Sequence, residues 1–401
     1  MTARADPAVP GTDGPPARPP RWDFLDGARA SMLLLGVPFH ASEIYRRSGD
    51  WMLASPETSW AATLLGCAVH VFRMPAFFVL AGFFAAMTIA RRGDARWIGE
   101  RCVRLGVPLV ASLLAFGWVE EAIVIASREG LGAGDALAAA LAAGPRQWSH
   151  HRWFLVVLLL HCASAVALRA LVPGSVLERA FDALARGPRA TLRLVVALVA
   201  LPFAIAGIGA LGGADGLGIG LDGSEPHANF YFQHGVFFAI GYALYRIDGS
   251  MRRLVAFGPG EVALAAVSIA LFALVHPSFR ADGVPLPGGA SGVAILLVRT
   301  GVDLVAGFFA TKLFFAAAHR FMAAPSPLAD RLVRVSLWVY LVHMVPVLGL
   351  GALLVPVALP PTLEIALIVV VATALSVATG ELVRRSTPLR LAFEGRRPER
   401  S

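Results

Sequence analysis

Cysteine and lysine are scarce in this chain of 401 residues. The three cysteines, Cys67, Cys102 and Cys162, lie in or beside apolar segments and lack the spacing of metal ligands. The sequence therefore supports neither a disulfide framework nor a zinc site. Lys312 is the single lysine, so arginine carries nearly all of the positive charge behind the net charge of +8.

Charged residues of both signs are also few. Only 15% of the residues are charged and 57% are hydrophobic, and the mean hydropathy is +0.67. Apolar runs recur that are long enough to cross a bilayer core of about 30 Å, so the sequence predicts an all-α, polytopic membrane protein with about ten transmembrane helices. The predicted spans are 27–46, 60–90, 105–127, 152–172, 191–210, 229–246, 255–276, 292–318, 335–356 and 362–384.

The loops between these spans predict the orientation. Arginines gather in alternate loops, which face the cytoplasm by the positive-inside rule, so both termini are expected inside. The same pattern argues against nucleic-acid binding. Residues 1–20 are rich in Pro, Gly and Ala without an apolar core, which predicts a disordered cytoplasmic tail rather than a signal peptide. A transmembrane domain is expected over 21–386, followed by a basic cytoplasmic tail over 387–401.

The first span, LDGARASMLLLGVPFH, carries ionisable groups that are costly inside a membrane. Arg29 and His40 are 11 residues apart, so they share a helix face about 16 Å apart along the axis. His40 can exchange a proton near neutral pH and is the candidate general base, with a packed structural histidine as the alternative. Glu43, one turn further on, is placed to orient the ring or to stabilise an imidazolium, and Asp26 accompanies Arg29.

His70 and Arg73 lie one turn apart in the second span, just before Pro75. A proline there frees a backbone carbonyl and can kink the helix, which makes room for a polar pocket. An arginine at such depth must face protein, water or an anionic ligand. Arg73 therefore either binds a substrate or forms an ion pair with a carboxylate such as Glu43 or Asp303.

Two further pairs have open interpretations. Arg101 and Arg104 lie at the cytoplasmic end of the third span, where guanidinium groups suit phosphate but also serve as plain positive-inside charge. Phosphorylated partners on that side include coenzyme A, nucleotides and lipid headgroups. Tyr340 and His343 lie one turn apart inside the ninth span, where they either pack structurally or face the same cavity as His40.

Several of these motifs together resemble the acyltransferase-3 family of membrane acyltransferases. The resemblance rests on LDGAR at 25–29, the gap to His40, FRMPAFF at 72–78 with GFF at 82–84, and the Arg101/Arg104 pair, and the segment SLWVYLVH at 336–343 adds a later match. It implies acyl transfer across a bacterial inner membrane, from cytoplasmic acyl-coenzyme A to a sugar hydroxyl on the far side. Acyl-coenzyme A is then a donor substrate, and no permanently bound cofactor or metal is expected.

The resemblance also implies roles for particular residues. His40 matches the histidine proposed as the family's catalytic base, Asp26 and Arg29 match the motif beside it, and Arg101 and Arg104 match the pair associated with the donor end. Within the family, FRMPAFF and HHRWFL are similar to the glucan biosynthesis protein C branch, which attaches succinyl groups to osmoregulated periplasmic glucans.

A succinyl donor would bring a free carboxylate into the membrane. Arg73 is the expected partner of that carboxylate, by charge and depth. His70, Tyr340 and His343 are expected to complete the substrate-binding residues.

An alternative from another class is a secondary transporter or a flippase for a polysaccharide or anionic solute. Buried His, Arg and Asp side chains would then form a proton relay or an anion path. Many transporters consist of two related halves, however, and we find no internal repeat in this sequence. The concentration of charge in the first three spans also favours the enzyme.

Overall fold

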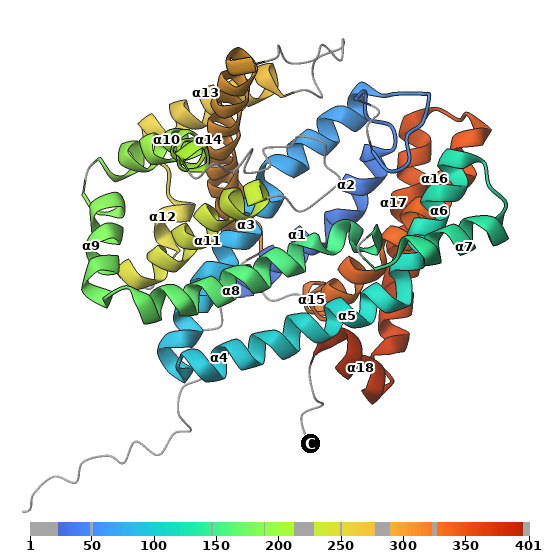
Figure 1. Cartoon of the computed structure of the whole chain (residues 1–401), viewed down its shortest axis with the longest axis horizontal. Coiled ribbons are helices and arrows are strands. Elements are labelled where there is room, and N and C mark those ends of the chain that lie inside the picture. The colour runs from blue at the N-terminus through green and yellow to red at the C-terminus, as the bar shows by residue number, and fades with distance from the viewer. Residues whose placement is uncertain are drawn as a thin grey trace, which may run out of the picture.

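The computed structural model is helical throughout its described residues, which are 23–48, 51–145, 147–187, 189–211, 228–248, 251–276, 289–322 and 327–395. No strand occurs within these ranges. The predicted tail over 1–20 and the end of the chain from 396 lie outside them. The helices pack side by side, with the N-terminal α1 and α2 in the interior and the last helices along one flank (Figure 1).

Several helices have the length and composition of membrane spans. Within the described ranges, five helices qualify, and a sixth span results if a pair bent by 58° is taken as one. The five are Trp60–Arg92 (α3), Asp94–Glu129 (α4 to α6), Gln147–Leu171 (ending in α8), Ser291–Phe321 (within α14) and Pro361–Val383 (α17). The bent pair is α15 (Pro327–Val342) with α16 (Met344–Leu354). The chain is therefore a polytopic membrane protein.

The remaining predicted spans coincide with shorter or broken helices. The first predicted span corresponds to α1 (Asp23–Leu34) followed by α2 (Gly36–Glu43). The others correspond to α10 (Ala190–Leu211), α11 (Ala228–Asp248) and α13 (Pro259–Val275). Every predicted segment thus lies on one helix or on a run of consecutive helical elements.

Short helices occupy the connections, where no helix was predicted. They are α7 (Ala133–Ala143), α9 (Gly174–Ala185), α12 (Arg252–Val255) and α18 (Thr387–Glu394). The last of these packs on α5 (Val107–Ser112), and its C-terminal Gly395, at φ +60°, lies so close to Arg104 that a Cβ would be 2.7 Å from the Arg104 Cα. The segment after the final span is therefore folded against the domain up to residue 395.

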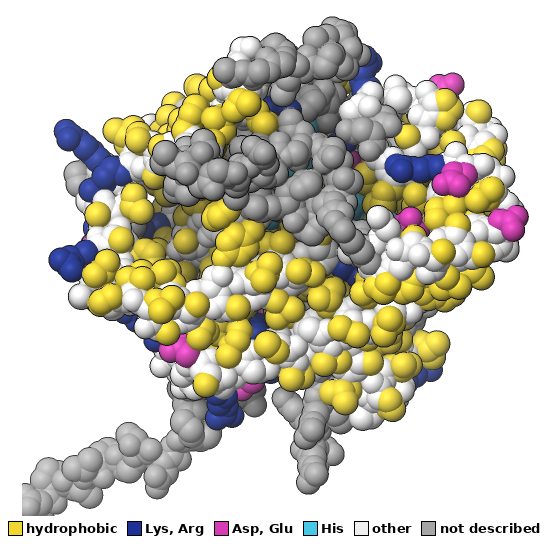
Figure 2. All heavy atoms as spheres, viewed as in Figure 1, with side chains coloured by type: hydrophobic (Ala, Val, Ile, Leu, Met, Phe, Trp, Pro, Cys, Tyr) yellow, Lys and Arg dark blue, Asp and Glu magenta, His cyan; other side chains and the backbone are white. Residues whose placement is uncertain are grey.

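Much of the surface is apolar. Figure 2 shows hydrophobic side chains spread over α8 and over the long helix from α4 (Asp94–Arg101) to α6 (Trp118–Glu129), with few charges between them. The exposed apolar residues on these elements include Val110, Leu114, Leu160 and Leu168. Large exposed apolar areas are unfavourable in water and are expected where lipid is the solvent.

Two glycines bring α3 and α11 into close contact. A Cβ at Gly82 would overlap the carbonyl oxygen of Phe238, and a Cβ at Gly241 would overlap that of Val79. Small residues at such a crossing let the backbones approach, which is a main source of helix association within lipid. Gly82 thus has a packing role in the GFF motif.

A fully buried ion pair ties four segments together. The Arg152 guanidinium donates to both Glu120 carboxylate oxygens at 2.8 Å, and neither side chain has any exposed surface. Arg152 also donates to the Ser112 hydroxyl at 3.2 Å and to the carbonyls of Trp148 and Leu341 at 3.2 and 3.4 Å. Bidentate geometry and these further bonds satisfy charges that would otherwise be expensive to bury.

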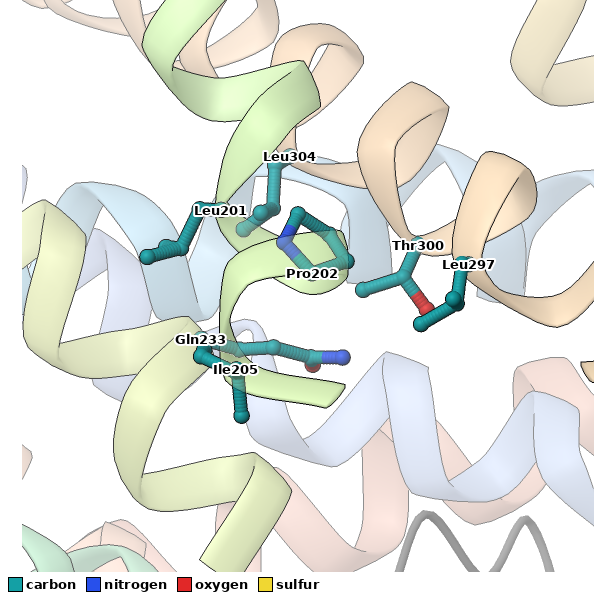
Figure 3. Close-up of a pocket in the computed structure, with 7 residues that line it drawn as sticks. All are labelled: Leu201, Pro202, Ile205, Gln233, Leu297, Thr300 and Leu304. Carbon is teal, nitrogen blue, oxygen red and sulfur yellow. The ribbon is translucent and has the colours of Figure 1, made fainter. Parts of the chain in front are cut away.

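Pro202 of α10 borders a small cleft against α11 and α14 (Gly289–Phe321) (Figure 3). Gln233 and Thr300 lie around it with several leucines, and its volume is about 10 Å³. That is room for about one water molecule. The cleft is too small for a substrate.

Replacing Gly82 with Ala should destabilise the protein by about 1–3 kcal/mol, because the added methyl group forces α3 and α11 apart. The matched control is Gly99→Ala, at a helical position where a Cβ would meet nothing within 4 Å. Thermal unfolding in detergent measures both variants. A Gly82→Ala protein with a melting temperature equal to that of Gly99→Ala would contradict this packing account.

Candidate functional site

Two helices break at the centre of the candidate site, and a proline follows each break by the same interval. Pro38 has no N–H to donate to the Leu34 carbonyl, and α1 ends at Leu34. In the same way, Pro346 has no N–H to donate to the Val342 carbonyl, and α15 ends at Val342. His40 lies just beyond the first break and His343 at the second. The broken helices therefore bring two histidines into the protein interior, His40 within α2 and His343 at the bend between α15 and α16.

Three imidazole rings meet at this point. The His40 ring centroid lies 5.3 Å from that of His343 and 6.2 Å from that of His151, and His151 and His343 are 4.9 Å apart. All three residues are buried. His151 arrives from the short helix Gln147–Arg152, beside the Arg152 and Glu120 ion pair.

The approach of His151 depends on unusual backbone. A Cβ at Gly117 would be 2.5 Å from the Trp148 Cβ, so only glycine admits this segment so close to α6. His150 has a φ of 34°, a strained value for a non-glycine residue, and its Nε2 lies 3.3 Å from a Glu121 carboxylate oxygen. The segment is thereby held with His151 directed inward.

The carbonyl of Tyr340 determines the tautomers of two histidines. It accepts a hydrogen bond from His343 Nδ1 at 2.8 Å and another from His151 Nε2 at 2.9 Å, while the Tyr340 hydroxyl donates to the His151 carbonyl at 2.9 Å. Because a carbonyl can only accept, His343 must carry its proton on Nδ1, which leaves a lone pair on Nε2. That Nε2 is buried and has no hydrogen-bond partner among the described residues. The His343 Nε2 atom is thus a buried hydrogen-bond acceptor that receives no donor from the described residues.

His40 has a similar open position. Its Nδ1 is buried and has no hydrogen-bond partner in the described part of the chain. Trp51 stacks on its ring at 5.7 Å with an interplanar angle of 20°, and Phe39 meets it edge-on at 4.8 Å. Aromatic rings hold the imidazole in place without using its nitrogens.

Arg73 reaches the same cluster. A Cβ at Gly36 would lie 3.0 Å from Arg73 Nη1 and 3.1 Å from His343 Nε2. The Arg73 guanidinium and the His343 imidazole therefore both lie against this glycine. Arg73 is also 4.7 Å above the Phe39 ring, and no ion pair within the described ranges includes it. The His70 ring also stacks on Phe39, with the ring centroids 5.8 Å apart. Within the described part of the chain, Arg73 thus has an aromatic partner, and no carboxylate lies within ion-pair distance of it.

Glu43 lies further along α2. Its carboxylate forms an ion pair with Arg46 at 2.9 Å and comes within 2.9 Å of the position of a Cβ at Gly66. This places the Glu43 carboxylate against α3.

The other predicted residues gather at the far end of α1, around a cavity of about 290 Å³. Six arginines line it: Arg29, Arg101, Arg104, Arg334, Arg384 and Arg390. Asp26 lies at the same end, 3.4 Å from Arg29, and about 21 Å along the helix from His40. The cavity therefore combines dense positive charge with an otherwise largely apolar lining.

The wall between this cavity and the histidines is aromatic. Phe77 and Phe154 line the cavity and lie 4.6 Å apart, edge to face. On its other side, Phe154 contacts the Tyr340 ring at 5.7 Å. One side chain thus separates the arginine-lined cavity from the residue that orients His343 and His151.

The helix that carries Arg101 and Arg104 is irregular here. Residues Cys102–Gly106 form a π-helical segment, and Leu113–Gly117 form a second. Such segments are rare and occur frequently at functional sites, because they redirect the side chains around them. At the mouth of the cavity, the Glu394 carboxylate of α18 pairs with Arg384 at 2.6 Å.

The structure thus divides most of the predicted residues into two groups. His40, His70, Arg73, Tyr340 and His343 lie together, whereas Arg29, Arg101 and Arg104 line the cavity, with Asp26 beside Arg29. Glu43 lies near the first group, with its carboxylate paired with Arg46. Sequence patterns alone did not indicate a site role for His151, Trp51, Arg152 with Glu120, or the cavity arginines of the C-terminal part. The available signal was the run His150–His151–Arg152 at the start of an apolar span, because ionisable side chains are costly inside a membrane.

A metal site does not account for the three histidines. Among the described residues, no group of three or more His, Cys, Asp or Glu side chains has an arrangement that could hold a metal ion.

Comparisons with known proteins show the family of the chain. The acyltransferase domain model of the acyltransferase-3 family matches residues 22–381. "Glucans biosynthesis protein C" of Salmonella gallinarum is 32% identical over 156 residues, and that of Salmonella paratyphi B is 34% identical over 143 residues. These alignments cover 38% and 35% of the chain and 40% and 37% of the relatives, so less than half of either relative is matched. No solved structure matches significantly. The chain belongs to the acyltransferase-3 family of membrane-bound proteins and is an acyltransferase.

Proposed function

We propose that this protein transfers an acyl group, specifically succinyl, from cytoplasmic acyl-coenzyme A to a hydroxyl of a periplasmic glucan or another extracytoplasmic glycan. The observation that carries the proposal is the juxtaposition of an arginine-lined cavity with a cluster of buried histidines across one phenylalanine. Two substrates can thereby reach one point from opposite sides. A transporter or flippase is not retained, because the acyltransferase domain matches nearly the whole chain.

The proposed topology has ten spans with both termini in the cytoplasm, in a bacterial inner membrane. Arginine-rich ends of the helices, including the cavity mouth, then lie on the cytoplasmic side. The unit that performs the reaction covers residues 21–386, between a cytoplasmic tail over 1–20 and a basic cytoplasmic segment over 387–401. Within that last segment, α18 borders the cavity.

The arginine-lined cavity is the proposed donor site. Guanidinium groups bind phosphate oxygens in pairs, and coenzyme A carries three phosphate groups at one end. Arg29, Arg101 and Arg104 hold these phosphates, and Asp26 acts through Arg29, with which it is paired. The apolar wall accepts the pantetheine arm, which presents the thioester toward Phe154 and Tyr340.

His40 is the proposed general base. It removes the proton from the acceptor hydroxyl as that oxygen attacks the thioester carbonyl. The new ester bond forms, the carbon–sulfur bond breaks, and the proton passes to the departing thiolate to give the coenzyme A thiol. Glu43 supplies negative charge one turn away that favours the transient imidazolium, and Tyr340 and His343 bind the reacting groups.

Arg73 and His70 are proposed to select the donor. The Arg73 guanidinium lies beside His343, so it can pair with the free carboxylate of a succinyl group. The two relatives are named for glucan biosynthesis, which supports a glucan acceptor.

Replacing His40 with Ala should lower the transfer rate about 10²–10⁴-fold, because the acceptor loses its base. The assay uses purified protein with succinyl-coenzyme A and a β-glucan oligosaccharide, and mass spectrometry of the glucan. His319→Ala is the control, since His319 is exposed and packs on Phe24 rather than on the cluster. Full activity in a folded His40→Ala protein would rule out this mechanism.

Replacing Arg73 with Met should lower the ratio of kcat/KM for succinyl-coenzyme A to that for acetyl-coenzyme A about 10–100-fold, since one charged hydrogen-bonding partner of the carboxylate is lost. Arg73→Lys retains the charge and should keep most of the preference. An equal loss with both donors would show that Arg73 does not recognise the carboxylate.

A further inference from the structure

We propose that Trp51 is the acceptor platform of this enzyme: its indole face stacks on a sugar ring and delivers one hydroxyl to His40. This inference rests on the proposed function, because it names how the glycan is held at the same site. It adds a residue that the family match and the sequence motifs leave without a role.

The first observation is the contact itself. The Trp51 ring is nearly parallel to the His40 ring, with centroids 5.7 Å apart. Trp51 is half-buried and packs against an apolar cluster that includes Ile44, whereas the imidazole beside it is buried. A tryptophan that anchored the protein in the interface would be expected to point toward lipid headgroups. This one points inward, to the proposed base.

The second observation is that the segment carrying Trp51 is fixed from several sides. Arg128 at the end of α6 donates to the carbonyls of Trp51 and Met52 at 3.0 and 2.8 Å. The backbone N–H groups of Ser55 and Ser59 donate to the last carbonyls of the α2 region, those of Ile44 and Tyr45, at 2.8 and 2.9 Å. Such anchoring positions an aromatic ring in advance, which lowers the entropic cost of binding a ligand against it.

The third observation is the position of this segment along the first helices. It covers the C-terminal end of α2, whereas the arginine-lined cavity surrounds the start of α1. A donor bound in the cavity therefore reaches His40 from the α1 side, and the Trp51 side is open to the acceptor. The two substrates then approach the cluster from opposite ends.

The chemistry of a sugar fits this surface. A pyranose ring has one face of C–H groups that packs on an aromatic ring, and its hydroxyls project from the rim. An indole beside an imidazole can hold that face while a rim hydroxyl meets the base. Aromatic contacts of this kind contribute about 0.5–1.5 kcal/mol beyond the area they bury.

The test compares Trp51→Ala, Trp51→Phe and Trp60→Ala in the full-length protein. Trp60 belongs to the same end of the molecule but is exposed and stacks on Arg47 at 4.2 Å instead of on His40. Three quantities are measured for each protein: the KM for a β-glucan oligosaccharide, the Kd of that oligosaccharide without donor, and the Kd of coenzyme A without glucan.

We expect Trp51→Ala to raise the KM and the Kd about tenfold, and Trp51→Phe to change them less than about threefold. Trp60→Ala should match the parent protein, and the Kd of coenzyme A should be equal in all four proteins. An unchanged glucan Kd in Trp51→Ala overturns the proposal, and so does an equal weakening of coenzyme A binding, which indicates loss of the fold rather than of an acceptor contact. Binding of glucan by the parent protein without any transfer would instead refute the proposed function and leave the platform standing.

Discussion

The buried ion pair between Arg152 and Glu120 is the interaction on which the site depends. It joins α5, α6, the segment Gln147–Arg152 and the broken end of α15 through one guanidinium. Because both side chains are fully buried, loss of either would leave an unpaired charge within the membrane domain, at a cost of about 3–5 kcal/mol. The neighbouring His151 and Tyr340 are therefore held in one arrangement.

Irregular backbone has a cost in a membrane, and two of the helix breaks in this protein lie beside the histidine cluster. The interruptions after Leu34 and Val342 leave carbonyls without their regular partners, and lipid offers no water to satisfy them. Here the irregular segments face each other in the protein interior, and the Tyr340 carbonyl nearby accepts from two imidazoles. The departure from regular helix thus creates a polar environment within the protein, while regular apolar helices face outward.

The sequence allowed the positions of the helices to be predicted, because apolar runs and proline positions are local signals. It also brought out His40, Arg73 and His343 as groups too costly to bury without a reason, and these three do lie together. Local signals could not predict the contacts of Trp51, His151 and Arg384, which depend on how segments far apart in the chain pack.

Sidedness is the most direct test of the central claim that two substrates meet from opposite faces. Membrane vesicles of both orientations are loaded with a β-glucan oligosaccharide, and succinyl-coenzyme A is added outside. The account predicts succinylated glucan only in inside-out vesicles, whose outer surface carries the arginine-lined cavity. Product in right-side-out vesicles alone, or only when donor and glucan share one compartment, would contradict it.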